Sequence, residues 1–176
     1  MVYSRAVSAM HWAVAPAMMG TVGSVLAAQQ AEGPRKGELM HLHKSLGLLT
    51  GMLVVPRLAI KLSSKLPPAV HGPAWEQMAG AVSHNVMYVW MVLMPATGIA
   101  MGYYGGKGLP FFSTTFAGAE TPNGGVAKQA FWMHKQAGIY GKYLIPLHLA
   151  GTAKHLVIDR NNILKRINPF SFASSA

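Results

Sequence analysis

Cysteine is absent from this chain of 176 residues, and acidic residues are scarce. Without cysteine the protein cannot form a disulfide, a thiolate zinc site, a cysteine-ligated iron–sulfur cluster or a covalently attached c-type haem. The 5 acidic residues stand against 15 Lys and Arg, which gives a net charge of +10. Because cysteine is absent, any haem must be held by His, Met or Tyr side chains.

Charge of either sign is rare in this chain, and apolar residues are abundant. Charged residues make up 11% of the sequence and hydrophobic residues 51%, a balance that is unusual for a soluble domain. The positive charges lie between apolar runs and do not cluster with aromatic residues, which argues against nucleic-acid binding. We expect an all-α integral membrane protein in contact with lipid, formed by a single domain over residues 1–176.

Apolar segments of membrane-spanning length occur four times. They cover residues 6–28, 41–60, 79–103 and 131–158, each long enough to cross about 30 Å of hydrocarbon as a helix. The segments between them, 29–39, 62–73 and 105–128, are rich in Gly, Pro or charge and are predicted to be connectors. Four spans place both termini on one side. That side carries the larger number of basic residues and is predicted to be the inside.

Two histidines in the fourth predicted span suggest the chemistry. His134 and His148 are separated by 14 residues, close to four helical turns, so on one continuous helix they would share a face about 21 Å apart. Such a helix could supply one axial ligand to each of two b-type haems. His11 and His43 lie near the inner end of the first span and the outer end of the second. Matching depths pair His11 with His148, and His43 with His134.

Glycine follows both ligands of the predicted outer pair at the same offset. Gly47 lies four residues after His43, and Gly138 four residues after His134. Residue i+4 shares the helix face of the ligand, so glycine there would leave room for a flat porphyrin ring. His41 competes with His43, but two residues apart on a helix means opposite faces.

Other polar residues allow a functional and an ordinary interpretation. Lys44 and Lys135 would steer an anion towards the outer haem, or would simply extend towards the membrane surface. His155, near the inner boundary like His84, would donate to a quinone or would be an ordinary helix-end histidine. We take Lys44, Lys135 and His155 as candidate catalytic residues. Lys142 falls within the predicted hydrocarbon layer and needs a partner that the sequence does not identify.

The spacing of these residues also matches a known pattern. It is carried by His11-Trp12, by His43-x-x-x-Gly47 with Arg57 downstream, by His84 with Tyr88, and by His134 with His148 and His155. The chain resembles the bacterial-type di-haem cytochrome b561 family, which includes a membrane-bound superoxide oxidase. The resemblance implies a four-helix bundle with two b haems, ligated by His11, His43, His134 and His148. We count Gly47, Gly138 and Arg57 with the cofactor-binding residues.

The function that this resemblance implies is electron transfer to or from ubiquinone, with superoxide as a candidate donor. The chain would then be an oxidoreductase of a bacterial plasma membrane or a mitochondrial inner membrane. An alternative is a haem-bearing anchor or accessory subunit of a larger respiratory or dehydrogenase complex. A third possibility is a membrane bundle without cofactor, whose histidines only form hydrogen bonds.

Overall fold

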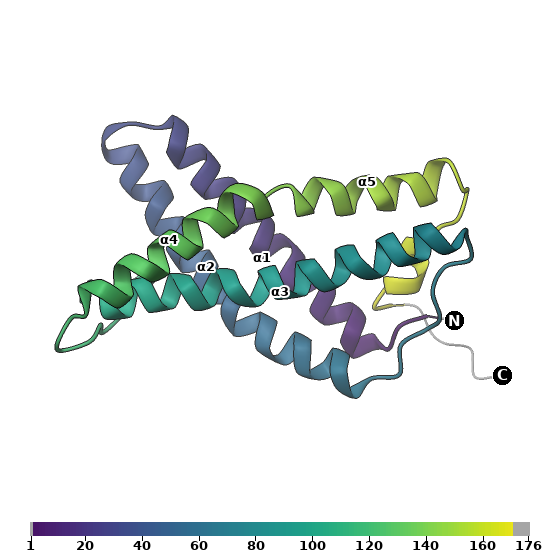
Figure 1. Ribbon diagram of the computed structural model, residues 1–176, viewed down its shortest axis with the longest axis horizontal. Coiled ribbons are helices and arrows are strands. Elements are labelled where there is room, and N and C mark those ends of the chain that lie inside the picture. Colours follow the sequence, from purple (N-terminus) through teal and green to yellow (C-terminus); the bar gives the residue numbers. More distant parts are fainter. Residues whose placement is uncertain (1, 171–176) are drawn as a thin grey trace.

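Helices dominate the computed structural model, which describes residues 2–170 (Figure 1). The all-α prediction is confirmed, apart from one short antiparallel hairpin of two strands. The elements in chain order are α1 (Arg5–Gln30), α2 (Gly33–Ser63), α3 (Ala74–Tyr104), β1 (Leu109–Phe111), β2 (Thr114–Phe116), α4 (Gly124–Gly141), α5 (Leu144–Val157) and the 3-10 helix η1 (Ile163–Ile167).

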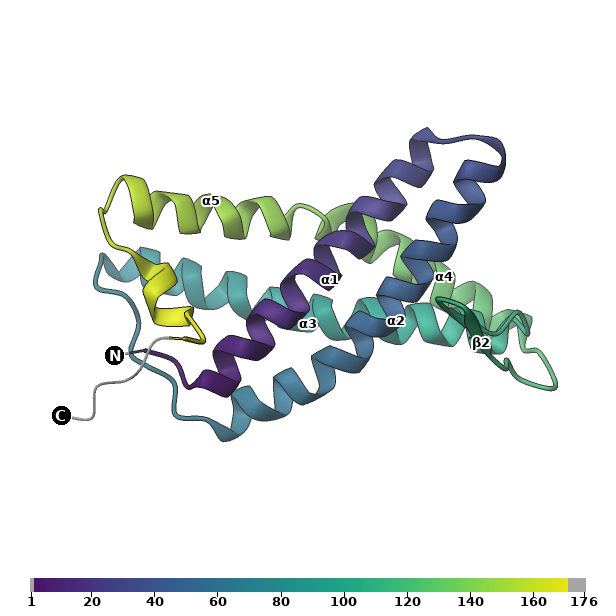
Figure 2. The same ribbon diagram turned by 180° about the vertical axis from the view of Figure 1, so that it is seen from behind.

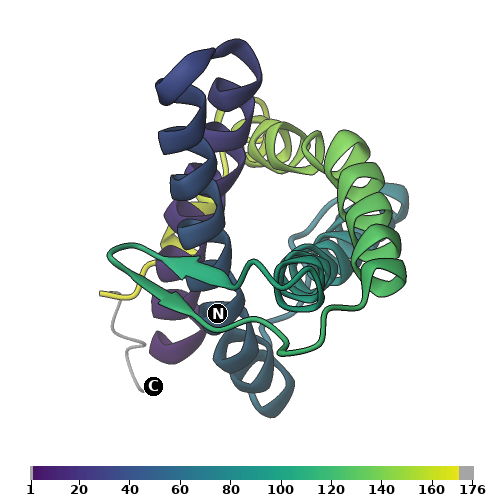
Figure 3. The ribbon, with the colours of Figure 1, turned by 90° about the vertical axis from the view of Figure 1, so that its left-hand side faces the viewer.

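Two helical arms cross one another. Helices α1 and α2 run side by side as one arm, while α3 packs against α4 and, less extensively, α5 to form the other (Figures 1 and 2). The N-terminus, the connector between α2 and α3, and the end of α5 lie together at what we call the terminal end. The hairpin and the turn between α1 and α2 lie at the opposite end, the hairpin end. Viewed along the long axis, the two arms face each other across the molecule (Figure 3).

The turn between α1 and α2 is much shorter than predicted. The segment 29–39 was expected to be a loop, but helix α2 already begins at Gly33 and only Ala31 and Glu32 lie between the two helices. Pro34 lies in the first turn of α2, where its missing N–H costs no hydrogen bond and its fixed φ suits the helix. The loop prediction was wrong because these breaker residues start a helix here.

The fourth predicted span is two helices. Helix α4 ends at Gly141, α5 begins at Leu144, and Lys142 and Tyr143 form a turn between them. Pro146 explains the break, because it cannot donate to the carbonyl of Lys142 and its ring would clash with that carbonyl. The prediction of one continuous helix over residues 131–158 was wrong. His134 and His148 therefore lie on different helices, and the argument from a shared helix face does not apply.

The core lies where the arms cross. Val14 of α1, Val54 of α2, and Trp90 and Met91 of α3 form its buried cluster. The Trp90 indole donates to the carbonyl oxygen of Ala137 at 3.0 Å and so joins α3 to α4. Trp90 also packs so closely on Gly141 that any side chain at that position would overlap its ring.

Much of the apolar surface faces outwards. Val55 is 71% exposed, Val89 67% and Leu147 60%, an arrangement that suits contact with lipid better than contact with water. Among the residues described, α2 and α3 are long and apolar enough to cross a membrane on length and composition alone. Helix α1 carries no charged residue from Ala6 to Gln30.

The C-terminal 3-10 helix ties the terminal end together. The Trp12 indole donates to the carbonyl oxygen of Ile167 at 2.9 Å, and the backbone N–H of Tyr3 donates to the carbonyl oxygen of Arg166 at 2.9 Å. The Arg166 guanidinium donates to the carbonyl oxygen of Pro68 in the connector between α2 and α3. The Trp12 N–H group thus joins α1 to the 3-10 helix.

Candidate functional site

Four histidines meet as two pairs in this fold. His43 of α2 and His134 of α4 have ring centroids 6.1 Å apart, and His11 of α1 and His148 of α5 have centroids 6.3 Å apart. A metal bound between two opposed imidazoles, with metal–nitrogen bonds of about 2.0 Å, would separate the ring centres by about 6 Å. Both separations therefore fit a metal ligated from two sides.

The Nδ1 atoms of the hairpin-end pair, His43 and His134, are fixed by hydrogen bonds. His43 Nδ1 lies 2.8 Å from the carbonyl oxygen of Thr21. His134 Nδ1 lies 3.0 Å from the carbonyl oxygen of Met94 and 3.0 Å from the Thr97 hydroxyl. A carbonyl oxygen can only accept, so Nδ1 carries the proton in both rings and Nε2 keeps its lone pair. Metal-ligating histidines are typically held in this way.

A cavity of about 570 Å³ adjoins the hairpin-end pair. Its volume lies within the range of ligand and cofactor sites. Its walls come from α1, α2, α3, α4 and the segment leading into the hairpin, and they are mostly apolar. Among the lining residues are both histidines, four glycines and three lysines: His43, His134, Gly47, Gly98, Gly108, Gly138, Lys44, Lys135 and Lys142.

Two glycines of this cavity, Gly47 and Gly138, are not required by contacts between protein atoms. A Cβ atom at Gly47 would meet Thr21 at 3.6 Å, and one at Gly138 would meet Met94 at 3.5 Å, both ordinary van der Waals distances. Gly98 faces the His134 ring, which a Cβ atom would approach to 3.4 Å. Side chains at Gly47 and Gly138 would thus be tolerated by the protein but would occupy cavity space, as expected for residues that make room for a flat ligand.

The terminal-end pair, His11 and His148, is arranged differently. Arg57 Nη2 donates to His11 Nδ1 at 3.3 Å and to the Tyr88 hydroxyl at 3.4 Å. His11 Nδ1 is therefore an acceptor, and in the neutral ring the proton lies on Nε2. Ligation through Nε2 requires Arg57 to release Nδ1. His84 adds a third imidazole, with its centroid 5.5 Å from that of His148.

Arg57 has hydrogen-bonding capacity to spare. Its Nε atom is buried and has no hydrogen-bond partner among residues 2–170, and its two contacts through Nη2 are both long. A buried, unsatisfied guanidinium N–H is costly, and a carboxylate is its best partner. Haem carries propionate carboxylates, so Arg57 fits a haem at this end, and pairing with a propionate would free His11 Nδ1.

The hairpin partly covers the cavity beside His43 and His134 at the hairpin end. Ser45 Oγ accepts from the backbone N–H of Phe112 at 2.9 Å, and His41 Nε2 donates to the Phe112 carbonyl oxygen at 2.8 Å. Leu109 and Pro110 of β1 line the cavity. His41 thus fixes the hairpin and does not join the paired histidines. The connector between α3 and α4 thus covers this end of the cavity; it is shorter than the predicted segment 105–128, because α4 already begins at Gly124.

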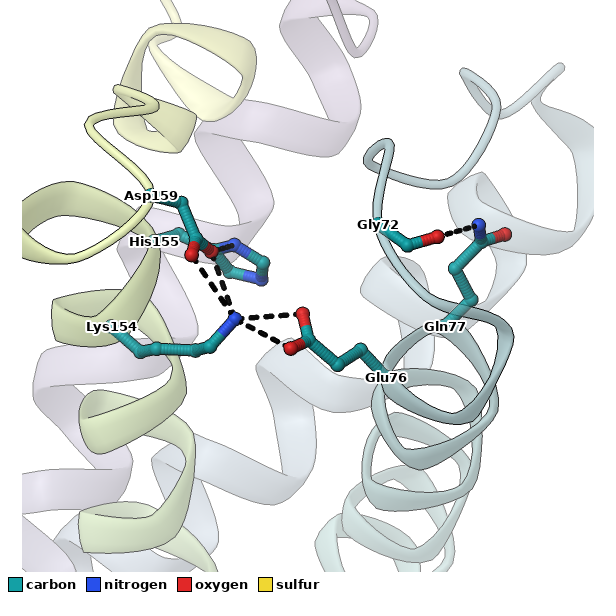
Figure 4. A network of polar contacts seen from close by, with 6 residues as sticks. All are labelled: Gly72, Glu76, Gln77, Lys154, His155 and Asp159. Atoms are coloured by element: carbon teal, nitrogen blue, oxygen red, sulfur yellow. Dashed lines mark hydrogen bonds and ion pairs between the residues drawn. The ribbon is translucent and has the colours of Figure 1, made fainter.

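Polar residues at the terminal end form a separate network (Figure 4). Lys154 contacts both carboxylate oxygens of Glu76 at 2.7 and 2.8 Å, and also contacts Asp159 at 3.0 Å. His155 Nδ1 lies 2.8 Å from Asp159. The hydrogen bond from Lys154, and that from His155, hold the pKa of Asp159 below its usual value. His155 is therefore oriented by a carboxylate that stays ionised.

Several residues that orient the histidines could not be recognised from the sequence. The Thr21 carbonyl, the Thr97 hydroxyl and Gly98 all surround the hairpin-end pair. A backbone carbonyl has no sequence signal, and a threonine in an apolar helix commonly bonds its own helix, as Thr97 also does with Leu93 at 2.7 Å. Gly98 alone could have been noticed, because a glycine inside an apolar helix often has a packing or functional reason.

Comparisons with known proteins place the chain among haem proteins. The profile of the prokaryotic cytochrome b561 family matches residues 2–169. Cytochrome b561 homolog 1 of Escherichia coli is 29% identical over 128 residues, which cover 72% of this chain and 73% of that protein. The probable superoxide oxidase CybB of Yersinia pestis is 28% identical over 129 residues, 73% of each chain.

Proposed function

Because the chain belongs to the prokaryotic cytochrome b561 family, a family of membrane haem proteins, we propose that it is a di-haem cytochrome b that passes electrons between the two sides of its bundle and ubiquinone. Residues 1–176 form one such domain in this proposal. It lies in a bacterial plasma membrane with both termini inside, which makes the hairpin end the outer end.

The pairing of the four histidines carries this proposal. His43 and His134 would hold the outer haem, and His11 and His148 the inner one, with centroid separations of 6.1 and 6.3 Å. When bound, each haem supplies an iron that takes up and releases one electron. Two histidine ligands would leave no position on each iron open to oxygen, which suits electron transfer. Gly47 and Gly138 would leave space for the outer ring, and Arg57 would pair with a propionate of the inner one.

Superoxide is the proposed electron donor at the outer end. Lys44 and Lys135 are exposed and line the outer cavity, so they would raise the local concentration of a small anion. A relative named as a probable superoxide oxidase supports this choice. Two superoxide anions would each lose one electron to become dioxygen. One ubiquinone would gain both electrons and two protons to become ubiquinol.

The inner end is the proposed quinone side. His155 is oriented by the ionised Asp159 through Nδ1, so its Nε2 atom remains available to donate a proton to a quinone oxygen. Lys154 joins Asp159 to Glu76 and offsets part of the negative charge of the two carboxylates near the site.

Single substitutions of the four histidines test the ligand assignment. The purified protein is reduced and its b-type α band is recorded for each variant. His43→Ala and His134→Ala should remove one spectral component, and His11→Ala and His148→Ala the other. His41→Ala serves as the matched control, because it removes a neighbouring imidazole from α2 that contacts the hairpin. If His11→Ala and His43→Ala deplete the same component, the pairing is wrong.

Ubiquinone reduction tests the reaction. The protein in detergent receives enzymatically generated superoxide and a short-chain ubiquinone, and ubiquinol is measured. We expect ubiquinol formation that stops on addition of superoxide dismutase and falls in His155→Ala with both haems retained. A haem-loaded protein that forms no ubiquinol would refute the proposed donor and acceptor.

A further inference from the structure

Lys142 lies in the turn between α4 and α5. It is the C-cap residue of α4, and its backbone N–H donates to the carbonyl oxygen of Gly138 at 3.3 Å. Pro146 causes the interruption, so the position of Lys142 follows from the break. In chain order Lys142 lies between His134 and His148, and Figure 1 shows the junction of α4 and α5 near the middle of the bundle. A charge at this depth would lie within the hydrocarbon layer.

The surroundings of Lys142 are apolar on two sides. It lines the outer cavity and also a groove of about 420 Å³ formed mainly by Met19, Val22, Leu26 and Ile145. Its ammonium group lies 5.1 Å from the centre of the Tyr143 ring. Within residues 2–170, no carboxylate lies within ion-pair distance of the Lys142 ammonium group, unlike that of Lys154, which contacts Glu76 and Asp159.

The helix end accounts for only part of this arrangement. A lysine at a helix C-terminus interacts favourably with the exposed carbonyls there. The cost of a charged residue in the middle of a bilayer exceeds that gain even on insertion scales. The helix end therefore does not offset the cost, and it does not explain why the side chain borders the cavity.

A positive charge beside the cavity would change the energetics of reduction there. Reduction adds one negative charge to a bound haem, and a fixed cation in an environment of low dielectric constant stabilises that state. Lys44 and Lys135 border the same cavity but are exposed, so solvent and salt screen them. Lys142 is half-buried and is the least screened of the three.

We propose that Lys142 sets the reduction potential of the outer haem, raising it above the value that a neutral residue would give. This inference rests on the proposed function, since it requires a haem held by His43 and His134. The positive charge of Lys142 stabilises the reduced outer haem and so makes the outer site a better acceptor for electrons from an external donor. No ligand role is assigned to it.

The size of the effect follows from Coulomb's law. Two unit charges about 10 Å apart, the scale of a cavity of this volume, change an equilibrium on the order of tenfold at an effective dielectric constant near 20. For a one-electron couple, a tenfold change in the ratio of reduced to oxidised protein is about 59 mV.

The test is a redox titration followed by absorption spectroscopy. Lys142→Met removes the charge and keeps the length of the side chain, and Lys142→Arg keeps the charge. Both are made in the full-length protein and in a His148→Ala background, which isolates the outer haem. We expect Lys142→Met to lower the outer midpoint potential by an amount equivalent to about a tenfold change in the ratio of reduced to oxidised protein, with unchanged haem content. Lys142→Arg should keep the wild-type potential.

Salt separates Lys142 from the exposed lysines. The shift in Lys142→Met should persist in 1 M salt, where the Debye length is about 3 Å, whereas the shift in the matched variant Lys44→Met should shrink. An unchanged potential in Lys142→Met, or an equal fall in Lys142→Arg, overturns the inference while leaving haem binding established. A wild-type protein without a b-type α band would overturn the proposed function as well. Lys142→Gln gives a second reading if Lys142→Met does not fold.

Discussion

Thr97 offers a sharp test of how the outer histidine is held. Its hydroxyl donates to the Leu93 carbonyl at 2.7 Å and therefore accepts from the His134 Nδ1–H at 3.0 Å. That N–H is shared with the Met94 carbonyl oxygen, also at 3.0 Å. Thr97→Val keeps the shape of the buried side chain and removes one of the two acceptors.

The expected loss can be bounded from this geometry. Removing a partner that orients a metal-ligating histidine typically weakens metal binding by about 10- to 100-fold. Because Met94 still accepts from Nδ1, we expect the lower end, about tenfold or about 1.4 kcal/mol, at the outer haem alone. The control is Thr152→Val, since the Thr152 hydroxyl donates to the His148 carbonyl at 3.0 Å and not to a ring nitrogen.

The assay is titration of haem-free protein with haem, followed by absorption, in wild type and both variants. Variants that lack the inner ligand His148 isolate the outer site. The reasoning is refuted if Thr97→Val binds outer haem as tightly as wild type does, or if Thr152→Val weakens outer binding equally.

Three further predictions concern other parts of the molecule. Gly138→Leu should exclude the outer haem by filling its cavity. Gly80→Leu, where a Cβ atom meets nothing within 4 Å, should leave the haem content unchanged. Equal haem content in both variants would contradict the proposed role of Gly138 in leaving space for the haem. The rate of superoxide-driven quinone reduction should fall with ionic strength in wild type and depend on it less in a Lys44→Gln/Lys135→Gln variant; a rate insensitive to salt in wild type would exclude steering. Because the pKa of Asp159 is lowered in the folded protein, its stabilising contribution should be present above the unfolded pKa of about 3.9 and lost as pH falls through the folded value. The difference in thermal midpoint between wild type and Asp159→Asn should therefore vanish in acid, and a difference that grows there would contradict the network.

Composition and periodicity were enough to predict the helical class. Long apolar runs interrupted by Pro, Gly and basic residues leave few alternatives to membrane helices. The breaker residues themselves were harder to interpret. Gly33-Pro34 begins α2 and Pro146 separates α4 from α5, whereas Pro16, Pro56 and Pro95 lie within continuous helices. Neighbouring packing decides between these outcomes, and the sequence does not show packing.

The two histidine pairs lie together although one premise of their prediction was wrong. His134 and His148 were expected on one helix face, and they lie on two helices. Depth along the chain nevertheless brought together the same partners, because residues at equal distance from one end of a bundle meet regardless of a local break. The oriented Nδ1 atoms and the Arg57–His11 contact depend on backbone carbonyls and rotamers, so only the structure could reveal them.

The most direct test of the central claim is the haem content of the purified protein. Haem is extracted and measured per chain in wild type and in His43→Ala/His11→Ala, alongside the reduced-minus-oxidised spectrum. The proposal predicts two b-type haems per chain in wild type, both low-spin, and none in the double variant. A wild-type preparation with one haem per chain, or with no b-type α band, would contradict it.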